Sequence, residues 1–384
     1  MILTQCAVCA TDLGLTLGKK CGRCSTRYCG AACQAQHWKE GGHDTLCKKI
    51  KRAGGAEQYN ANKKYSEAVA VAAEACAEDT KGQTCYICTQ ALHWKTKEGL
   101  VRGCSCRGTA GFAHVSCLAE QAKILVAEAE DNNLDMEPKW RRWHSCSMCE
   151  QRHHGVVLCA LGWACWKTYV GRPEEDWARL KGPAMTLLGN GLSAARHYED
   201  ALAVFEAELA TLRRLGASEG HMLITQGNLA NTYHHLGRLE DSIRVQQDIY
   251  SGHVRLSGEE SEGTLAAAHN YASFLSHVKR YAEAKPLLRK TIPVARRVLG
   301  ENHDLTLRMS LCYAVSLYLD RKATLEDLRE AATALEGLER TTRRVMGGAH
   351  PRVGNIELVL RHARETLRAH EEANSLREAM APPK

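Results

Sequence analysis

The chain has 384 residues, which exceeds one ordinary core and predicts two to four domains. Its net charge of +7 is spread over 51 basic and 44 acidic residues, which argues against nucleic acid as a partner. The longest apolar stretch, residues 155–166, is shorter than the roughly 20 residues that a membrane-spanning helix needs. Composition therefore argues against a membrane span.

The cysteines divide the chain into two halves. Seventeen of the 18 lie at or before Cys165, and the remaining one is Cys312. The opening segment MILTQCAVC has a metal-type cysteine pair and no pattern typical of a secretory signal. In a reducing compartment, such cysteines favour metal binding over disulfides. We therefore expect a soluble intracellular protein, cytoplasmic or nuclear, whose first half binds metal.

A first group of candidate ligands occupies residues 6–47. Its members form four pairs with metal-binding spacing: Cys6 and Cys9, Cys21 and Cys24, Cys29 and Cys33, and His43 and Cys47. Zinc takes four thiolate or imidazole ligands, so eight ligands make two tetrahedral sites. In the last two pairs the residues are four apart and share one face of a helix.

The string YCGAACQAQHW, followed by His43 and Cys47, resembles the MYND finger family over residues 6–47. This resemblance implies that alternate pairs share an ion. One zinc would bind Cys6, Cys9, Cys29 and Cys33, and the other would bind Cys21, Cys24, His43 and Cys47. His37 is an alternative to His43, because it lies one helical turn after Cys33.

MYND fingers dock short extended peptides, and the resemblance assigns that role to the segment containing Gln34 and Trp38. A partly exposed tryptophan on a small rigid scaffold can anchor such a peptide. The alternative is that Trp38 only covers the zinc core, since so small a finger has few other apolar residues.

A second group of eight candidate ligands occupies residues 85–149. Its pairs are Cys85 and Cys88, Cys104 and Cys106, His114 and Cys117, and Cys146 and Cys149. The string GCSCRGTAGFAHVSCL, with one residue between Cys104 and Cys106, resembles the RING-CH (variant RING) family. The resemblance implies one zinc on Cys85, Cys88, His114 and Cys117, and another on Cys104, Cys106, Cys146 and Cys149.

RING fingers hold a ubiquitin-conjugating enzyme and supply no nucleophile of their own. By this resemblance Ile87 is the contact for the conjugating enzyme. The sequence departs from the family at Gln121, where a tryptophan is usual, in its long spacer before Cys146, and at Glu150, where active RINGs often have a basic residue. Trp140 and Trp143 either replace the missing aromatic contact or pack inside the domain.

Helical patterns surround the second finger. The segment AEQYNANKKYSEAVAVAAEACAEDTKG predicts an amphipathic helix that buries Cys76, and GVVLCALGWACWKTYVG predicts a second helix. Cys159 and Cys165 lack paired spacing, so they are interpreted as buried thiols. The alternative, a metal site with the neighbouring His153 and His154, stays open.

From about residue 180 the sequence repeats every 41 or 42 residues. Small residues recur at Gly189, Ala230, Ala272 and Ala314, and again twelve positions later at Ala201, Ser242 and Ala284. Helix-ending glycines recur at Gly216, Gly258, Gly300 and Gly347, each preceded by arginines that favour a helix C-terminus. The copy GNLANTYHHLGRLEDSI resembles the tetratricopeptide repeats of kinesin light chains.

The predicted fold is thus multidomain, with two cross-braced zinc fingers followed by an all-α solenoid. The predicted domains are a MYND-type finger in 1–50, a helical linker in 51–84, a RING-CH-type finger in 85–152, a connecting helix in 153–179, tetratricopeptide repeats in 180–354, and a capping helix and tail in 355–384.

Two functions fit this architecture. In the first, the chain is a RING-type ubiquitin ligase that uses about four zinc ions, a ubiquitin-conjugating enzyme, and substrates bound by the MYND finger and the repeats. In the second, all modules are docking surfaces and the chain is a scaffold for proteins or peptides. A methyltransferase of the kind that carries a MYND finger is excluded, because no segment remains for its catalytic domain.

Overall fold

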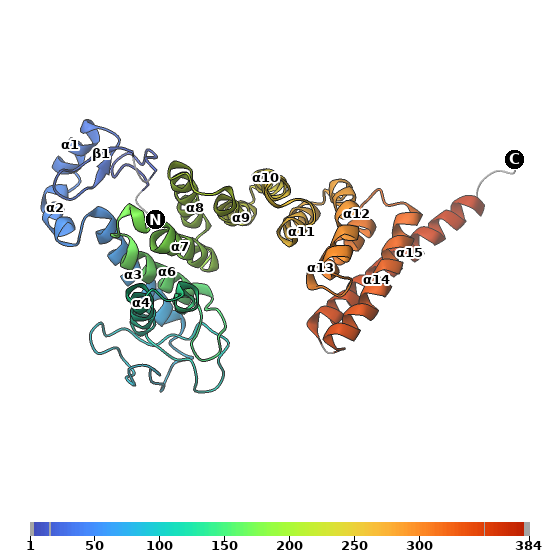
Figure 1. Ribbon diagram of the computed structural model, residues 1–384, viewed down its shortest axis with the longest axis horizontal. Helices are drawn as coiled ribbons and strands as arrows, with labels where there is room; N and C mark the ends of the chain where they lie inside the picture. The colour runs from blue at the N-terminus through green and yellow to red at the C-terminus, as the bar shows by residue number, and fades with distance from the viewer. Residues whose placement is uncertain (1–3, 15–16, 349, 380–384) are drawn as a thin grey trace. The chain divides into compact units, whose positions relative to one another are not determined.

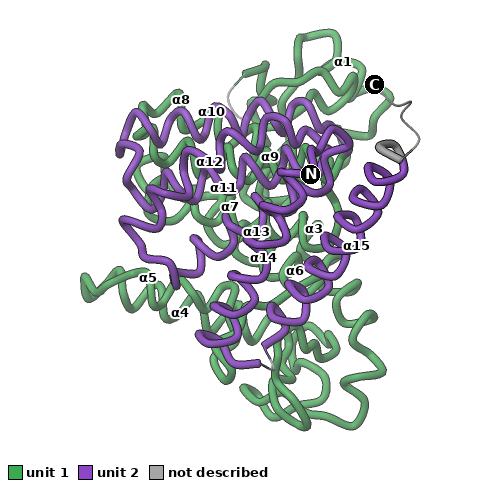
Figure 2. The backbone as a smooth tube through the Cα atoms, turned by 90° about the vertical axis from the view of Figure 1, so that its right-hand side faces the viewer, with its two compact units in different colours: residues 1–236 green, residues 237–384 purple. Residues whose placement is uncertain are grey.

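The computed structural model describes residues 4–14, 17–348 and 350–379. The chain divides into two compact units, Met1–Leu236 and Gly237–Lys384 (Figure 2). Among the described residues, no helix combines the length and apolar character needed to cross a bilayer.

The first finger has little regular structure and a small core. A two-residue ribbon pairs β1 (Lys19–Lys20) with β2 (Arg27–Tyr28) in antiparallel register. Two helices follow, α1 (Ala31–Lys39) and α2 (His43–Arg52) (Figure 1). The buried apolar cluster of this finger consists of Cys6, Leu13, Cys21, Cys24, Tyr28, Cys47, Ile50 and Ala56. Half of this core is cysteine, so we expect metal binding to stabilise the finger.

A buried helix connects the second finger to the repeats. This helix, α6 (Gly155–Tyr169), packs against α3 (Ala56–Ala75), α4 (Val115–Asp131) and α7 (Gly182–Ala194). Residues 157–166 of α6 are all buried, as expected for a helix that is apolar all round. Shorter elements complete this region: α5 (Met136–Trp140), two 3-10 turns (Arg141–Trp143 and Glu174–Asp176) and a π-helical turn (Trp177–Lys181).

Successive antiparallel helices form the repeats in both units. In the first unit α7 is followed by α8 (Tyr198–Arg214) and α9 (Glu219–His235). The second unit contains α10 (Leu239–Ser257), α11 (Glu262–His277), α12 (Tyr281–Val298), α13 (Asp304–Tyr318), α14 (Leu325–Met346) and α15 (Pro351–Ala379). Each helix of this unit packs on the next, and α11 also contacts α13. The predicted all-α solenoid is confirmed.

The periodic small residues lie where helices meet. Ala230, Ala272 and Ala314 are fully buried, and a Cβ atom at Gly189 would come within 2.4 Å of the Phe205 ring. Small side chains at these positions let the helix backbones approach closely. The four periodic glycines all have positive φ, between +64° and +96°, as a helix-ending residue requires.

The last repeats contain a long turn and a capping helix that begins before the predicted boundary. Residues 319–324 separate α13 from α14, so this turn is three residues longer than in the earlier hairpins. Thr324 and Asp327 form a capping box that fixes the new helix start. The capping helix begins at Pro351 instead of residue 355, because proline is favoured in the first helical turn.

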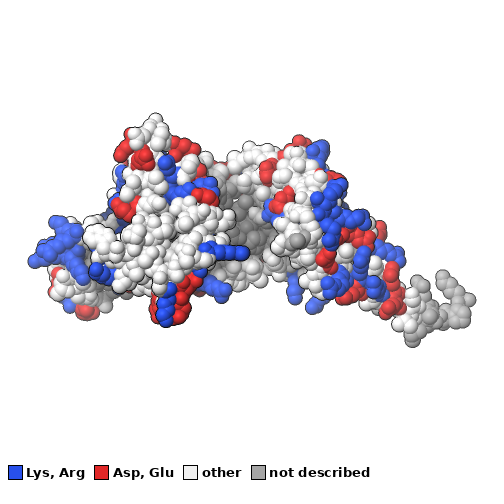
Figure 3. Space-filling model, turned by 90° about the horizontal axis from the view of Figure 1, so that it is seen from below, with Lys and Arg blue, Asp and Glu red and all other residues white. Residues whose placement is uncertain are grey.

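The arginines before the periodic glycines are not a free basic stripe. Arg297 pairs with Glu260 at 2.6 Å, and Arg343 pairs with Glu339 at 2.6 Å. Arg214 pairs with Glu174. In Figure 3 basic and acidic side chains are intermingled over the second unit on the face shown. Arg214, Arg297 and Arg343 are therefore paired with neighbouring carboxylates.

Candidate zinc centres

The described residues contain four clusters of cysteine and histidine that can hold a metal ion. Within each cluster the candidate ligand atoms lie within 4.8 Å of one another. The clusters are Cys6, Cys9, Cys29 and Cys33; Cys21, Cys24, His43 and Cys47; Cys85, Cys88, His114 and Cys117; and Cys104, Cys106, Cys146 and Cys149. The structure thus brings together the same four sets that the two family resemblances imply.

All four Cys-x2-Cys loops have one backbone design. In each, the N–H of the first cysteine donates to the carbonyl five residues later, as from Cys6 to Thr11 at 2.8 Å. The residue four positions after the first cysteine donates back to that cysteine's carbonyl. This residue has positive φ in every loop: Ala10, Ser25, Thr89 and Glu150 lie between +55° and +62°. The turn aims both sulfur atoms of a pair at one point.

The distances within the clusters suit tetrahedral zinc. Four zinc–sulfur bonds of about 2.3 Å separate neighbouring sulfur atoms by about 3.8 Å. The Sγ atoms of Cys21 and Cys47 are 3.8 Å apart, as are those of Cys106 and Cys146. In the first cluster Cys29 Sγ lies 3.4 Å from Cys9 Sγ and 3.5 Å from Cys33 Sγ. All four clusters therefore fit zinc.

His43, and not His37, completes the second cluster. Its Nε2 atom is 3.4 Å from Cys24 Sγ, and its side chain is buried. The His37 ring lies 4.9 Å from the His43 ring, but its Nδ1 pairs with the Tyr28 hydroxyl at 3.0 Å. His37 thus packs beside the ligand histidine and has a different partner.

His114 directs Nδ1 at the third cluster, whereas His43 directs Nε2 at the second. The Nδ1 atom is 3.3 Å from Cys88 Sγ and 3.7 Å from Cys117 Sγ. The opposite ring nitrogen, Nε2, donates to the Ala91 carbonyl at 3.4 Å. This hydrogen bond orients the imidazole and leaves Nδ1 free to bind metal.

Crowded thiols make each cluster a site for a cation. The neighbouring Cys29 sulfur raises the pKa of the Cys33 thiol to about 12. Burial, followed by the nearby Cys24 and Cys21 sulfurs, raises the pKa of Cys47 to about 11. The three or four thiols of one cluster cannot all ionise together unless a positive ion neutralises them. A divalent metal supplies that charge.

Two threonines support the first finger's ligands, and no sequence-based prediction identified them. The Thr11 hydroxyl lies 3.0 Å from Cys9 Sγ, and the Thr26 hydroxyl lies 3.1 Å from Cys24 Sγ. Each threonine follows the second cysteine of its pair by two positions. That repeated spacing is the sequence signal that would have identified them.

Gly111 lies against the fourth cluster. It has a φ of +84°, and a Cβ atom there would lie 2.6 Å from Cys106 Cβ and 3.0 Å from its Sγ. Gly108 also has positive φ, at +61°, but open space surrounds its Cα. Only Gly111 therefore makes room for a ligand cysteine.

The four cysteines outside the predicted pairs belong to no metal cluster among the described residues. Cys76, Cys159 and Cys165 are buried, and Cys312 is half-buried. Burial raises the pKa of Cys159 to about 11 and keeps that thiol protonated. His153 is also buried, and it joins neither Cys159 nor Cys165 in a cluster. In the described part of the chain these cysteines are thus buried or half-buried thiols outside the four clusters.

Exposed side chains mark one face of the first finger. Trp38 is 44% exposed, although its ring also packs on the edge of His43 at 5.8 Å. Gln34 lies one turn earlier on α1 and is half-buried. Residues four apart share a helix face, so Gln34 and Trp38 form one surface. Trp38 is therefore exposed enough to meet a partner.

The second finger exposes apolar residues on two of its metal loops. Ile87 is 36% exposed on the first loop, and Met148 is 52% exposed on the last. The Tyr86 hydroxyl and the Ser147 hydroxyl pair at 3.0 Å, which holds these two loops together. On α4, Gln121 is half-buried and Ile124, one turn later, is 58% exposed.

Both tryptophans of the spacer are buried. Trp143 is fully buried and Trp140 is 9% exposed, and each ring contacts Tyr169 of α6. Their burial argues against the alternative in which they replace the missing aromatic contact of the family. They pack the second finger onto α6, as buried aromatic side chains commonly do.

Three family models match the chain. A MYND finger model matches residues 6–47, a RING-variant domain model matches residues 85–149, and a tetratricopeptide repeat model matches residues 223–262 and 264–304. The chain combines two zinc-finger modules with tetratricopeptide repeats. The predicted MYND, RING-CH and repeat resemblances are confirmed. With the four clusters, these matches support a zinc-binding protein that acts through protein interactions.

Two solved structures illustrate what the chain is similar to. One is a putative kinesin light chain from Podosopora anserina with nearly identical TPR-like repeats, at 15% identity and a TM-score of 0.42. It covers 61% of this chain and 98% of its own. Another is BtubC (BKLC) from P. vanneervenii, at 11% identity and a TM-score of 0.37, covering 70% of this chain and 93% of its own. No curated protein sequence matches the chain.

Proposed function

We propose that the sixteen clustered residues are ligands of four structural zinc ions. Their grouping, the sulfur separations near 3.8 Å and the shared loop design support this assignment. Elemental analysis of the purified chain tests it, with about four zinc ions expected per chain. A count near two would mean that one finger does not bind metal as assigned.

We further propose that the chain is a RING-type ubiquitin ligase. The observation that carries this proposal is the apolar pair Ile87 and Met148, exposed on two metal loops that the Tyr86–Ser147 hydrogen bond joins. Apolar side chains on rigid loops suit the docking of a partner, here a ubiquitin-conjugating enzyme. The MYND finger and the repeats would then bind substrates.

One charged pair bears on the activity of this finger. Glu150 follows the last ligand, where active RINGs often have a basic residue. In this chain the Arg142 guanidinium reaches the same place, because it donates to the Cys146 carbonyl at 3.3 Å and to Glu150 at 2.9 Å. Glu150 neutralises that cation, which favours the alternative function of a scaffold without transfer activity.

A ubiquitin-chain assay with a panel of conjugating enzymes distinguishes the two functions. The ligase predicts chain formation by the wild type, strong loss with Ile87→Ala, and complete loss with Cys85→Ser. Val71→Ala is a matched control, because Val71 is an exposed apolar residue on α3, outside the finger. Inactivity of zinc-loaded protein with every conjugating enzyme would support the scaffold.

The MYND finger is proposed to dock a peptide through Gln34 and Trp38. The exposure of the Trp38 ring supports this role. Trp38→Ala should abolish the capture of peptides by this finger while the zinc content stays unchanged. Equal capture by the variant and the wild type would assign Trp38 to the zinc core instead.

A further inference from the structure

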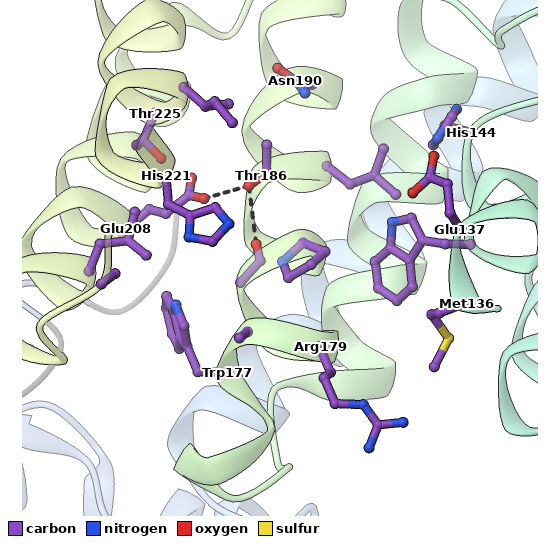
Figure 4. A pocket seen from close by; sticks show the side chains of 18 of the residues that line it. Met136, Glu137, His144, Trp177, Arg179, Thr186, Asn190, Glu208, His221 and Thr225 are labelled. Atoms are coloured by element: carbon purple, nitrogen blue, oxygen red, sulfur yellow. Dashed lines mark hydrogen bonds between the residues drawn. The ribbon is translucent and has the colours of Figure 1, made fainter. Parts of the chain in front are cut away.

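A cavity of about 760 Å³ opens within the first unit, away from the metal ligands (Figure 4). Its walls come from the π-helical turn, α7, α8 and α9, together with α5 of the second finger. It has the size of a site for a small molecule or for one side chain of a partner. Its lining includes two buried polar groups that lack partners.

The first of these groups is the carboxyl of Glu208. This side chain is only 4% exposed, and its Oε1 atom accepts a hydrogen bond from the Thr186 hydroxyl (Figure 4). Its Oε2 atom has no hydrogen-bond partner in the described part of the chain, although the Thr225 hydroxyl lies near the carboxyl and lowers its pKa. A buried carboxyl oxygen without a partner is costly, so the site favours a ligand that donates to it.

The second group is the indole N–H of Trp177, whose side chain is 6% exposed. Its Nε1 atom has no acceptor among residues 4–14, 17–348 and 350–379. In the cavity, Glu208 Oε2 therefore needs a hydrogen-bond donor, and Trp177 Nε1 needs an acceptor. Buried polar groups are nearly always paired, so a single ligand with both functions fits this cavity best.

The surroundings of the Glu208 carboxyl favour one kind of donor group over another. A guanidinium binds a carboxylate best through both oxygens at once, and the Thr186 hydrogen bond takes one of the two lone pairs of Oε1, so this bidentate fit is less favourable here. A primary ammonium is a point charge and needs only one oxygen. We propose that this cavity binds the side chain of one lysine in an extended segment of a partner protein. Its ammonium group pairs with Glu208 Oε2, and a backbone carbonyl of the same segment accepts from Trp177 Nε1.

The rest of the cavity suits this ligand. Leu187 and Ile224 line it, and Ile224 is 63% exposed, so they offer apolar surface to the lysine stem. The other charged or titratable lining residues are Asp135, Glu137, His144, Arg152, Arg179 and His221. The two arginines are exposed, and Arg179 points away from Glu208 in Figure 4. Solvent screens such charges, whereas Glu208 is buried, and pairing with a lysine ammonium would favour its ionised form.

This inference is independent of ubiquitin transfer, because neither Ile87 nor any metal ligand lines the cavity. A chain that fails the ubiquitin assay could still bind lysine here, and an active ligase could lack this site. The two proposals can therefore fail separately.

Fluorescence anisotropy with labelled peptide pools tests the proposal on the full zinc-loaded chain. The pools differ only in their central residue, which is lysine, arginine, acetyl-lysine or norleucine, and their other positions exclude lysine and arginine. Norleucine keeps the aliphatic stem and removes the ammonium group. We expect the lysine pool to bind at least about tenfold more tightly than the other three.

Glu208→Gln keeps the shape of the side chain and removes its charge, so it should abolish the preference for lysine. Glu206→Gln is the matched control, since Glu206 lies on the same helix but is exposed and outside the cavity. It should leave the preference intact.

Three results would overturn the proposal. Equal binding of the lysine and norleucine pools would exclude an ammonium site, without requiring any change in the protein. An unchanged lysine preference in Glu208→Gln would place the site elsewhere. Free N-acetyl-lysine methylamide that binds as tightly as the peptides would identify a small amine, and not a partner segment, as the occupant.

Discussion

The first finger buries only eight apolar residues in its described part, and four of them are cysteines. The repeats of the second unit instead bury a continuous set of aliphatic side chains between neighbouring helices, including Leu275, Leu288, Leu317 and Leu335. Metal ligation concentrates stability in a few atoms, whereas helix packing spreads it over many contacts. Loss of a metal ion should therefore unfold a whole finger, whereas a substitution in the repeats should lower stability only in part.

Metal removal should have the largest effect, and it should unfold the fingers while the repeats stay folded. Structural zinc contributes on the order of 10 to 16 kcal/mol in small fingers, so chelation should unfold residues 4–52 and 85–152. Helices α10 to α15 contain no ligand of the four clusters and should keep their structure. Hydrogen exchange with and without chelator measures both regions, and zinc-saturated chelator is the control. Loss of protection in α10 to α15 as well would show that the repeats also depend on the metal.

Replacement of Gly111 should remove a single site. A methyl group there would clash with Cys106, so Gly111→Ala should cost about 3 kcal/mol or more and lower the metal content by about one ion per chain. Gly108→Ala also changes a glycine with positive φ, but open space surrounds it, so it should keep all four ions. Elemental analysis with thermal unfolding distinguishes the two variants. Identical metal content would contradict the steric argument.

Glu208 should make the stability of the first unit depend on pH. Burial raises its pKa from 4.5 to about 7, although the nearby Thr186 and Thr225 hydroxyls oppose this rise. The folded state therefore holds its proton more strongly than the unfolded state. Stability is lost as pH rises from 4.5 through 7, because ionisation then favours unfolding.

Glu208→Gln removes this loss and should raise the free energy of unfolding at pH 8.5 by on the order of 2 kcal/mol relative to the wild type. At pH 6 the gain should be about half as large, because only part of the loss has developed at that pH. Denaturant unfolding of both proteins at the two pH values measures the difference, and their identical zinc sites cancel. A gain of equal size at both pH values would rule out titration of Glu208 as its cause.

A larger side chain in the packed core of a repeat should lower the free energy of unfolding only moderately. Ala272 is fully buried where α11 meets its neighbours, so Ala272→Leu should cost about 1 to 3 kcal/mol without changing the metal content. Ala282 lies on α12 and is exposed, and Ala282→Leu should change stability by less than about 0.5 kcal/mol. Calorimetry of both variants tests this. A loss of zinc in Ala272→Leu would mean that repeats and fingers share one cooperative core.

The two regions also differ in how far the sequence predicts them. Ligand pairs such as Cys85 and Cys88 are predictable, because metal geometry dictates short spacings within one turn. The buried periodic positions of the repeats are predictable for the same local reason. Trp140 and Trp143 left two alternatives open, because their burial depends on contacts with Tyr169 of α6.

The cavity around Glu208 was not predicted at all. Thr186, Glu208 and Trp177 come from different elements, and no spacing signals that they meet. A glutamate on a helix is usually solvated, and only the packing of α7 and α9 on α8 makes this one buried. Sites built from local spacing can therefore be found in the sequence, whereas sites built from tertiary packing need the structure.

The smallest expected effect lies in the shared loop design of the fingers. Thr89 has a φ of +61°, and a β-branched residue is strained in this left-handed conformation. Thr89→Gly should relieve that strain and raise the free energy of unfolding by about 0.5 to 1 kcal/mol, with the zinc content unchanged. Thr84 is exposed and has no positive φ, so Thr84→Gly should instead lower stability by a similar amount. Opposite signs in the two variants would show that backbone conformation, and not ligand identity alone, limits the stability of the second finger.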